Sequence, residues 1–291
     1  MSTETIDRSA RDRVFAVVGA TGQQGGATAR ALLTSGTGVR ALVRNSQSAP
    51  AQALAKRGTQ LVRADLDDAV SLRAAFTGVD GVFAMTTFAT DRGTEGEVEH
   101  GTAIADAALQ AGVSHVVYSS VGGAERHTGI PHFESKRRVE EHLESLDLSA
   151  TFVCPTFFMD NFVRLAPQVE DGTLVFRMPL PAGVPLQMIA TADVGEVAAA
   201  ALLDPDRIVG ERIEIAGDEL TGEQIAAVHG DHAGLPARYE PIPLDALADN
   251  PDQAAMFAWF AHPPSYQADF AATRNLVPSV RNLATWLRST R

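Results

Sequence analysis

Cysteine is almost absent from this sequence of 291 residues, in which Cys154 is the single thiol. One thiol excludes an intramolecular disulfide and a cysteine-based zinc site. The histidines, among them His100, His127 and His229, show no metal-ligand spacing with carboxylates or with one another, so no metal site is expected. A single unpaired cysteine fits a reducing compartment, and we expect a cytoplasmic protein.

Positive charge and long apolar runs are also scarce. Only 24 Lys and Arg stand against 36 Asp and Glu, which leaves a formal net charge of -12. Affinity for nucleic acids depends on cationic groups that face phosphates, so direct DNA or RNA binding is disfavoured. No apolar stretch approaches the roughly 20 residues needed to cross a bilayer. We therefore expect a soluble protein that acts on a small molecule or a protein partner, as a monomer or a dimer.

From Arg13 onward, short β-branched runs alternate with Ala-rich amphipathic segments. This pattern predicts an α/β fold, a doubly wound parallel sheet covered by helices. The expected strands are Val14–Val18, Val39–Val43, Thr59–Ala64, Gly81–Thr86, His115–Ser119 and Thr151–Pro155, and the expected helices lie at about 25–45, 68–76, 97–111 and 133–145.

Beyond Phe158 the pattern loosens. It predicts a hairpin over Gly172–Ile189, a helix over Asp193–Leu203, a strand over Arg212–Ala216 and a helix after Thr221. We therefore expect a flexible leader over 1–12, a dinucleotide-binding domain over 13–158, and a smaller, non-contiguous α+β part over 159–291. Some segments of this last part are expected to return to the parallel sheet. No Pro-rich or Ser-rich linker separates the parts, so a cleft between packed parts is expected.

A glycine-rich loop, GATGQQG, joins the first expected strand to the first expected helix. Glycines in such a loop permit a tight turn, a close approach of the backbone to a pyrophosphate and close packing of the helix, whose N-terminus offers free N–H groups to the phosphates. The alternative is an ordinary Gly-rich turn, but the position in the first βαβ unit favours a Rossmann dinucleotide site. The loop residues expected to bind it are Gly19, Thr21, Gly22, Gln23, Gln24 and Gly25.

The end of the second strand selects between NAD and NADP. Arg44 supplies a guanidinium group suited to a 2′-phosphate, Asn45 and Ser46 can add hydrogen bonds, and no acid is present to repel the charge. The alternative for Arg44 is a solvated surface residue. The sequence favours NADP(H).

Further cofactor contacts are expected where later strands end. Asp65, followed by Leu66, stands where such folds meet the adenine, although Asp65 can equally be the N-cap of the helix that begins near Asp68. Thr86 and Thr87 should line the dinucleotide crevice, because ligands of open α/β sheets bind outside the carboxyl ends of the strands.

In combination, several segments give the chain a family resemblance. These are GATGQQGG, VRN, VVYSS, HFESKRRVEEHL, PTFFMDNF and ATADVGEVAAAALL. The chain resembles the NmrA-like, or HSCARG-like, branch of the atypical short-chain dehydrogenases/reductases. The resemblance implies an NADP(H)-preferring Rossmann domain and a small C-terminal part that closes a cleft. It implies a redox-sensing regulator or an NAD(P)H-dependent reductase. One departure is Glu99, where relatives such as HSCARG carry a Lys.

Reductases of the wider superfamily use a Tyr and, four residues later, a Lys on one helix face. Here the two positions hold His132 and Lys136. Lys136 can bond the nicotinamide ribose, or pair with Glu140 one turn along the helix. An imidazole can donate a proton near neutral pH, but a nearby ammonium group and an oxidised nicotinamide disfavour imidazolium at His132. The alternative is a structural histidine behind Pro131. Ser120, at the end of the fifth strand, stands where an orienting serine could lie.

The end of the sixth strand is expected to wall the nicotinamide pocket. Pro155 and Phe158 should contact the cofactor, and Phe157 and Asn161 the substrate. Apolar walls exclude water, which suits hydride transfer and simple binding equally. The missing Tyr favours a redox-sensing regulator that acts through a protein partner. The alternative is an NADPH-dependent reductase of a quinone, imine, enone or other small carbonyl compound.

Overall fold

The computed structural model describes residues 12–205, 208 and 212–290, and its contacts divide the chain into two compact units. The expected leader lies outside the described residues up to position 11. The first unit is Met1–Ser119 with Val139–Phe152 and Ala198–Glu211, and the second is Ser120–Arg138 with Val153–Val197 and Arg212–Arg291.

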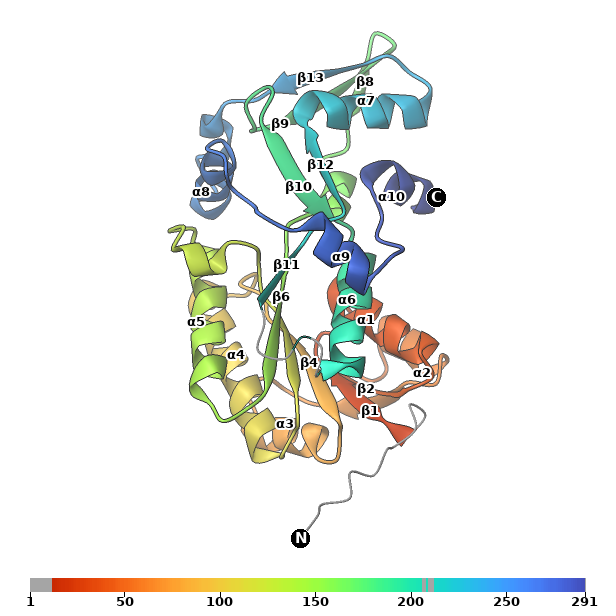
Figure 1. Cartoon of the computed structure of the whole chain (residues 1–291), viewed down its shortest axis with the longest axis vertical. Coiled ribbons are helices and arrows are strands. Elements are labelled where there is room, and N and C mark those ends of the chain that lie inside the picture. The colour runs from red at the N-terminus through yellow and green to blue at the C-terminus, as the bar shows by residue number, and fades with distance from the viewer. Residues whose placement is uncertain (1–11, 206–207, 209–211, 291) are drawn as a thin grey trace. The chain divides into compact units, whose positions relative to one another are not determined.

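A seven-stranded sheet with the order β11-β6-β5-β4-β1-β2-β3 organises the fold (Figure 1). The pairings of β1 with β2 and β4, of β2 with β3 and of β4 with β5 are parallel. The order reverses beside β1, which confirms the predicted doubly wound α/β class. The strands are β1 (Val14–Val17), β2 (Gly38–Val43), β3 (Gln60–Arg63), β4 (Gly81–Met85), β5 (Val116–Ser119), β6 (Ala150–Pro155) and β11 (Arg212–Ile215).

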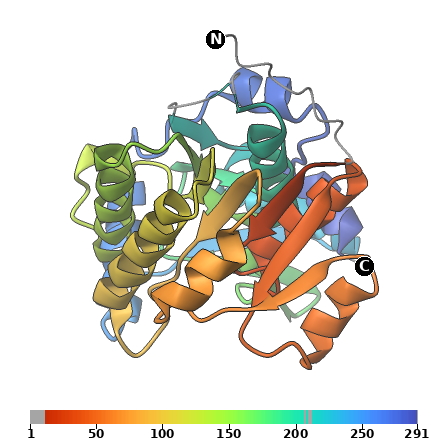
Figure 2. The same cartoon turned by 90° about the horizontal axis from the view of Figure 1, so that it is seen from below.

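Helices cover both faces of this sheet, with α1 and α2 on one face and α3 and α4 on the other (Figure 2). Because both faces are covered, the central strands are apolar throughout, and Ala16, Val17, Val82 and Phe83 are fully buried. The helices are α1 (Gln23–Thr34), α2 (Ala49–Ala55), α3 (Ala69–Phe76), α4 (Gly93–Gln110) and α5 (Pro131–Ser145).

One prediction for the first unit was wrong, and one helix was not predicted. The first helix, expected to reach about residue 45, ends at Thr34, because the chain turns at Gly36 (φ +80°) before β2 begins. The short helix α2 was not predicted. Its start signals are Ser48, whose side chain accepts a hydrogen bond from Ala51 N, and a proline in the first turn.

The second unit contains two three-stranded sheets. The predicted hairpin over Gly172–Ile189 was wrong, because β9 and β10 lie in different sheets. The observed hairpin joins β8 to β9 through Asp171 and Gly172, which have φ values of 48° and 79°. An Asp-Gly pair is a strong hairpin signal for this reason. The sheets are β12 (Asp218–Thr221), β10 (Pro185–Ile189) and β7 (Phe157–Phe158), and β13 (Ala237–Pro241), β9 (Thr173–Met178) and β8 (Gln168–Glu170).

The remaining helices follow β10 along the chain. The helix expected over Asp193–Leu203 is present as α6, and the helix expected after Thr221 is α7. In α7, Thr221 and Gln224 form a reciprocal capping box that satisfies two terminal N–H groups. The helices are α6 (Thr191–Leu203), α7 (Gly222–Ala233), α8 (Pro251–Phe260), α9 (Phe270–Leu276) and α10 (Leu283–Ser289).

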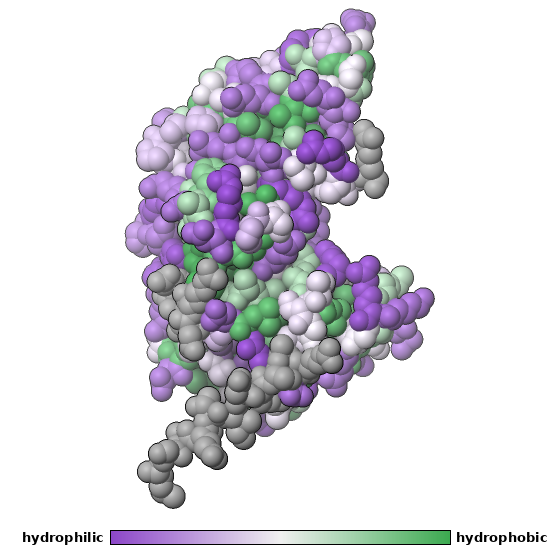
Figure 3. All heavy atoms as spheres, turned by 45° about the vertical axis from the view of Figure 1, so that its right-hand side comes forward, coloured by the Kyte–Doolittle hydropathy of each residue, from purple (hydrophilic) through white to green (hydrophobic). Residues whose placement is uncertain are grey.

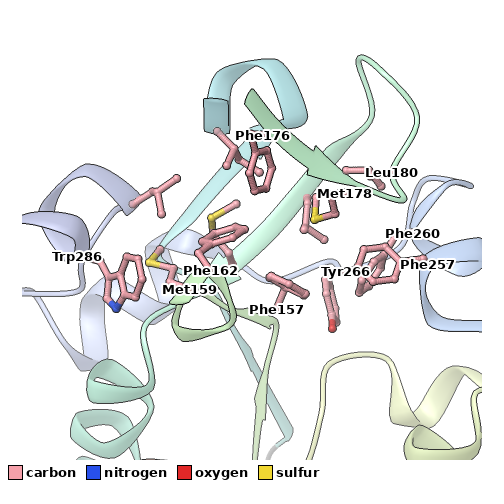
Figure 4. Close-up of a cluster of buried hydrophobic side chains, with 14 of the residues drawn as sticks. Phe157, Met159, Phe162, Phe176, Met178, Leu180, Phe257, Phe260, Tyr266 and Trp286 are labelled. Carbon is pink, nitrogen blue, oxygen red and sulfur yellow. The ribbon is translucent and has the colours of Figure 1, made fainter. Parts of the chain in front are cut away.

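An aromatic core holds the second unit together (Figure 4). Phe162 packs edge-on against Phe176 and near Trp286, with ring centroids 5.7 and 6.4 Å apart. His229 of α7 stacks on Phe176 at 5.9 Å with an interplanar angle of 16°. Its Nε2 is buried and has no hydrogen-bond partner among the described residues. The imidazole is therefore placed as one more ring of the core.

Within the described residues, no helix is long and apolar enough to cross a membrane. On the face drawn in Figure 3, hydrophilic residues predominate and hydrophobic residues are scattered among them. The large apolar side chains that are exposed include Val70, Val163 and Val169. Singly exposed residues of this kind are normal on a protein surface.

Burial of His229, together with the nearby His232, lowers its pKa to about 4. The unfolded chain, with an ordinary histidine pKa of about 6.5, binds the proton more readily. His229 therefore costs no stability above about pH 6.5 and destabilises the fold as the pH falls toward 4. We compare the free energy of unfolding of His229→Phe with that of the natural chain. This difference should favour the variant by about 2 kcal/mol more at pH 5 than at pH 8.

Urea unfolding at the two pH values measures this difference. His262→Phe, which makes the same replacement at an exposed position, is the matched control for the substitution itself. An equal effect of His229→Phe at both pH values would show that the pKa of His229 is the same in the folded and unfolded states.

Candidate functional site

The glycine loop is built on a close contact between backbone segments. Gly19 follows β1 with φ +68°, a conformation that favours glycine, and its carbonyl oxygen accepts a hydrogen bond from Gly22 N at 2.9 Å. A Cβ atom on Gly25 would lie 2.3 Å from the Gly19 oxygen and 2.7 Å from the Val18 oxygen. Only glycine at position 25 lets the first turn of α1 pack this closely on the strand end.

The N-terminus of α1 is open to an anion. Its N-cap is Gly22, which provides no side-chain hydrogen bond, and the first turn contains no acidic residue. The side chains of Thr21 and Gln23 are exposed. The first N–H groups of a helix have no partner within it and carry partial positive charge, so this terminus suits a phosphate.

Gln24 accepts hydrogen bonds with both its side-chain and its main-chain oxygen. Its side-chain Oε1 accepts a hydrogen bond from Ser119 Oγ at 2.5 Å, and its main-chain oxygen accepts one from Thr28 Oγ1 at 3.0 Å. Gln24 therefore links the start of α1 to the end of β5, and its role in the loop is at least partly to hold these two elements together.

Arg44 follows the last residue of β2 and is exposed. Its guanidinium group makes no ion pair or hydrogen bond with any residue that the structure describes. The turn behind it is ordered, because Asn45 Oδ1 accepts from Gln47 N at 2.9 Å and the Asn45 carbonyl accepts from Ser48 Oγ at 3.0 Å. Ser46 is partly buried, and its carbonyl oxygen accepts from Gln52 Nε2. An unpaired guanidinium on an ordered turn is suited to an anionic ligand.

Asp65 is exposed at the end of β3, next to the partly buried Leu66. Its Oδ1 accepts a hydrogen bond from Asp67 N at 3.1 Å. The N-cap of α3 is Asp68, whose Oδ1 accepts from Val70 N and Ser71 N. The interpretation of Asp65 as the N-cap is therefore wrong.

Thr86 and Thr87 lie at the end of β4 but differ in exposure. The hydroxyl of Thr86 is buried, 2.9 Å from the hydroxyl of Tyr118 and 3.2 Å from the carboxylate of Glu97. Thr87 is exposed, and its Oγ1 accepts from Ala89 N at 3.1 Å. Of the pair, Thr87 has the hydroxyl nearer to solvent.

Glu99, the departure from the family pattern, forms an ion pair on the surface of α4. Its Oε2 lies 2.7 Å from Arg92 Nη1, and a second nitrogen of Arg92 lies 2.6 Å from Asp67 Oδ1. The hydrogen bond and charge of Arg92 lower the pKa of Asp67. Both side chains of the Glu99 pair are about half exposed, so solvent weakens the attraction.

His132 and Lys136 lie one turn apart in α5, which begins at Pro131. Lys136 is 9% exposed, and the side chain of His132 is 15% exposed. His132 Nδ1 lies 2.7 Å from Oδ2 of Asp252, and the main-chain N–H of His132 donates to Oδ1 of the same carboxylate at 3.0 Å. Burial raises the pKa of Asp252, but the hydrogen bonds and charge of His132 outweigh it and leave this pKa below its ordinary value.

Asp252 was missed by sequence reasoning. It follows Asn250, whose side chain accepts from Gln253 N and caps α8, and Pro251 in the first helical turn. These residues signal the start of a helix. No local pattern signals that the helix start meets a residue 120 positions earlier in the chain.

The other expected residues near the nicotinamide position lie in the second unit. Ser120 is buried, and its Oγ has no hydrogen-bond partner among the described residues. Pro155 is buried, and Phe157 packs against Phe162 and Phe260 with centroids 5.7 and 6.2 Å apart. Phe158 is partly exposed, as is Asn161. Phe157 thus belongs to the aromatic core, whereas Phe158 presents part of its surface.

In the described part of the chain, no three His, Cys, Asp or Glu side chains gather where they could hold a metal ion. Cys154 is buried, with its Sγ 3.6 Å from Arg212 Nη1.

One family model covers residues of both units. The model of the NmrA-like family matches residues 11–281. This chain belongs to the NmrA-like family. The match extends from the start of the parallel sheet through α9, so both units belong to the shared fold.

Two relatives of this NmrA-like protein are named as oxidoreductases. An NmrA-like family domain-containing oxidoreductase of Aspergillus hancockii is 33% identical over 257 residues, which cover 80% of this chain and 76% of that one. An NAD(P)H azoreductase of Xenophilus azovorans is 33% identical over 231 residues, which cover 79% and 77% of the two chains.

Solved structures share the NmrA-like fold. NmrA, a negative transcriptional regulator in complex with NADP, has a TM-score of 0.81 and 24% identity, covering 96% of this chain and 95% of that one. An NADPH-dependent quinone oxidoreductase of Escherichia coli in complex with NADPH has the same TM-score and identity, covering 95% and 99%. At this identity they show the fold alone, which is common to a regulator and a reductase.

Proposed function

We propose that this protein is an NADPH-dependent reductase of a small molecule with an electrophilic double bond. Such molecules are quinones, enones and other small carbonyl compounds, imines, and azo compounds. The observation that carries the proposal is the 33% identity with an NAD(P)H azoreductase over more than three quarters of both chains. This outweighs the preference for a regulator that the missing tyrosine suggested, because the solved regulator is only 24% identical.

The residues of the glycine loop fit a dinucleotide. The uncapped N-terminus of α1 offers N–H groups to a pyrophosphate, and the exposed Gly22 lets that group approach the backbone. Arg44, which has no protein partner among the described residues, would bond the 2′-phosphate of NADP(H), supported by Asn45 and Ser46. The other residues that we assign to the cofactor are Gly19, Thr21, Gln23, Gln24, Gly25, Asp65, Leu66, Thr86, Thr87, Pro155 and Phe158.

The residues assigned to the chemistry lie at the end of β5 and in α5. Bound NADPH supplies a hydride. Lys136, one of only two lysines in the chain, would bond the ribose hydroxyls and fix the position of the nicotinamide. The buried hydroxyl of Ser120, which has no hydrogen-bond partner in the described residues, would orient the substrate, and Asn161 would bind it. His132 occupies the position of the superfamily tyrosine and would donate the proton.

A redox-sensing regulator is the second candidate. The observation in its favour is that His132 replaces the tyrosine, since loss of a dedicated acid lowers turnover by a factor of about 10² to 10⁴. In that case the cofactor would shift an equilibrium between two conformations only as far as it binds them differently. Turnover separates the two candidates.

We expect the purified protein to consume NADPH with at least one member of a panel of quinones, enones, imines, aldehydes and azo dyes. Lys136→Ala should reduce this turnover by about 10-fold or more, because the nicotinamide loses its positioning group. Lys56→Ala, at the exposed end of α2, is the matched control and should leave the rate unchanged. Tight NADPH binding without turnover of any acceptor would favour the regulator.

We expect Arg44→Asp to weaken NADPH binding by about 100-fold while changing NADH binding by less than about 3-fold, because only NADPH carries the 2′-phosphate. Calorimetric titration with both cofactors measures the two constants. Arg73→Asp, in α3, changes the charge by the same amount and controls for long-range electrostatics. Equal losses for the two cofactors would remove Arg44 from the phosphate site.

If His132 is the proton donor, His132→Ala should lower the turnover of an imine or azo compound by about 10-fold or more, whereas His132→Tyr should maintain it. The tyrosine restores the acid of the wider superfamily on the same helix face. Steady-state rates with saturating NADPH test this. Unchanged rates in both variants would assign His132 a structural role.

A further inference from the structure

We propose that Asp252 is a positioning residue that makes His132 an effective proton donor, and that the substrate is one whose reduced atom is a strong base, such as an azo compound or an imine. This inference rests on the proposed reductase function. It concerns a carboxylate on α8 that lies outside the glycine loop and the strand ends.

The carboxylate of Asp252 holds His132 at two points. One oxygen lies 2.7 Å from the imidazole Nδ1, and the other accepts the main-chain N–H of the same residue at 3.0 Å. The imidazole lies within ion-pair distance of one carboxylate oxygen while the main-chain N–H of the same residue is bonded to the other, so the side chain has little freedom to rotate. A proton transferred to a substrate therefore leaves from Nε2, on the opposite side of the ring.

Both partners are fixed by the aromatic core. Phe257 and Phe260 of α8 are 4% and 0% exposed, and Figure 4 shows them beside Tyr266. Phe133, the residue after His132, contacts Trp259 of α8 with ring centroids 5.5 Å apart. The first turn of α5, which carries the imidazole, thus meets α8, which carries the carboxylate, within the second unit. Such support keeps an active group in a single geometry.

The pair also supplies the charge that an acid at this position needs. Lys136 lies one turn along α5, and an oxidised nicotinamide is cationic, so positive charge would gather at this position. Asp252 brings the opposite charge within ion-pair distance, and Glu134 adds an acidic residue to the first turn of α5. The side chains of His132 and Asp252 are 15% and 16% exposed, so solvent screens their attraction less than it would at the surface.

The proposed step balances with the hydride from NADPH. The double bond receives the hydride on one atom, and the other atom forms a bond to the proton from Nε2. The Nε2–H bond breaks, His132 becomes neutral, and water then returns a proton to it. The substrate would gain two electrons and two hydrogens, the hydride supplied by NADPH and the proton by His132. Reduced quinone oxygens are weak bases that take protons from water, so a quinone needs this donor far less than an azo compound does.

A purely structural role for Asp252 makes a different prediction. The carboxylate accepts an N–H of the first turn of α5 and so stabilises the helix start. Asparagine preserves this function, since its oxygen can accept the same N–H. Its amide NH₂ group would then face Nδ1 and force this nitrogen to accept a hydrogen bond, which disfavours imidazolium. Asp252→Asn therefore separates helix capping from support of the donor.

We expect Asp252→Asn to lower kcat for an azo dye by about 10- to 100-fold, to lower kcat for a benzoquinone by less than about 3-fold, and to leave the KM for NADPH unchanged. Asp249→Asn, an exposed acid just before α8, is the matched control. Equal losses with both acceptors, or an unchanged azo rate, would overturn the proposal.

Nitrogen-15 spectra of the His132 imidazole give a readout that does not depend on turnover. In the natural chain Nδ1 should carry a proton, and in Asp252→Asn the proton should move to Nε2. If the spectra change as expected but the natural chain reduces no acceptor, the proposed function is wrong and the pairing stands. If the natural chain is active and neither the spectra nor the azo rate responds to Asp252→Asn, the inference is wrong and the reductase stands.

Discussion

The approach of Gly25 to the carbonyl oxygen of Gly19 is the contact on which the rest of the glycine loop depends. With 2.3 Å between that oxygen and the position of a Cβ, the two segments meet backbone to backbone, and the start of α1 is fixed at the end of β1. Ser119 and Gln24 fix the same helix start to the end of β5. Parallel strands end at one edge, so the groups that follow β2, β3 and β4 are presented at the edge that this helix terminus occupies.

The second unit is stabilised mainly by the packing of its buried side chains. Its sheets are small and its strands short, and aromatic side chains make up a large share of its buried core. One consequence is that α5 and α8 meet through Phe133 and Trp259, and that a carboxylate can be held next to an imidazole with little solvent around either. A solved regulator and a solved reductase share this fold, so the fold by itself does not decide the function.

Features encoded by neighbouring residues were predictable from the sequence. The seven strands, the glycine loop and the unpaired Arg44 position follow from periodicity and from residue types at fixed offsets. Errors occurred where distant segments compete. The strand pairing of β9 and β10 depends on β8, β12 and β13, so adjacency suggested the wrong hairpin. Asp252 could not be found at all, because its role exists only once α8 has packed against α5. The short helix α2 and the Asp171–Gly172 turn carried readable local signals that were overlooked.

The separation of 120 residues between His132 and Asp252 also orders the events of folding. A loop of this length is closed at a cost in chain entropy that must be met before the contact can form, whereas the glycine loop involves seven consecutive residues. During synthesis, the N-terminal segments leave the ribosome first and can begin to fold while the later ones are still being made. The glycine loop can thus form on a nascent chain. The imidazole of His132 can meet the carboxylate of Asp252 only after more than 250 residues have been translated.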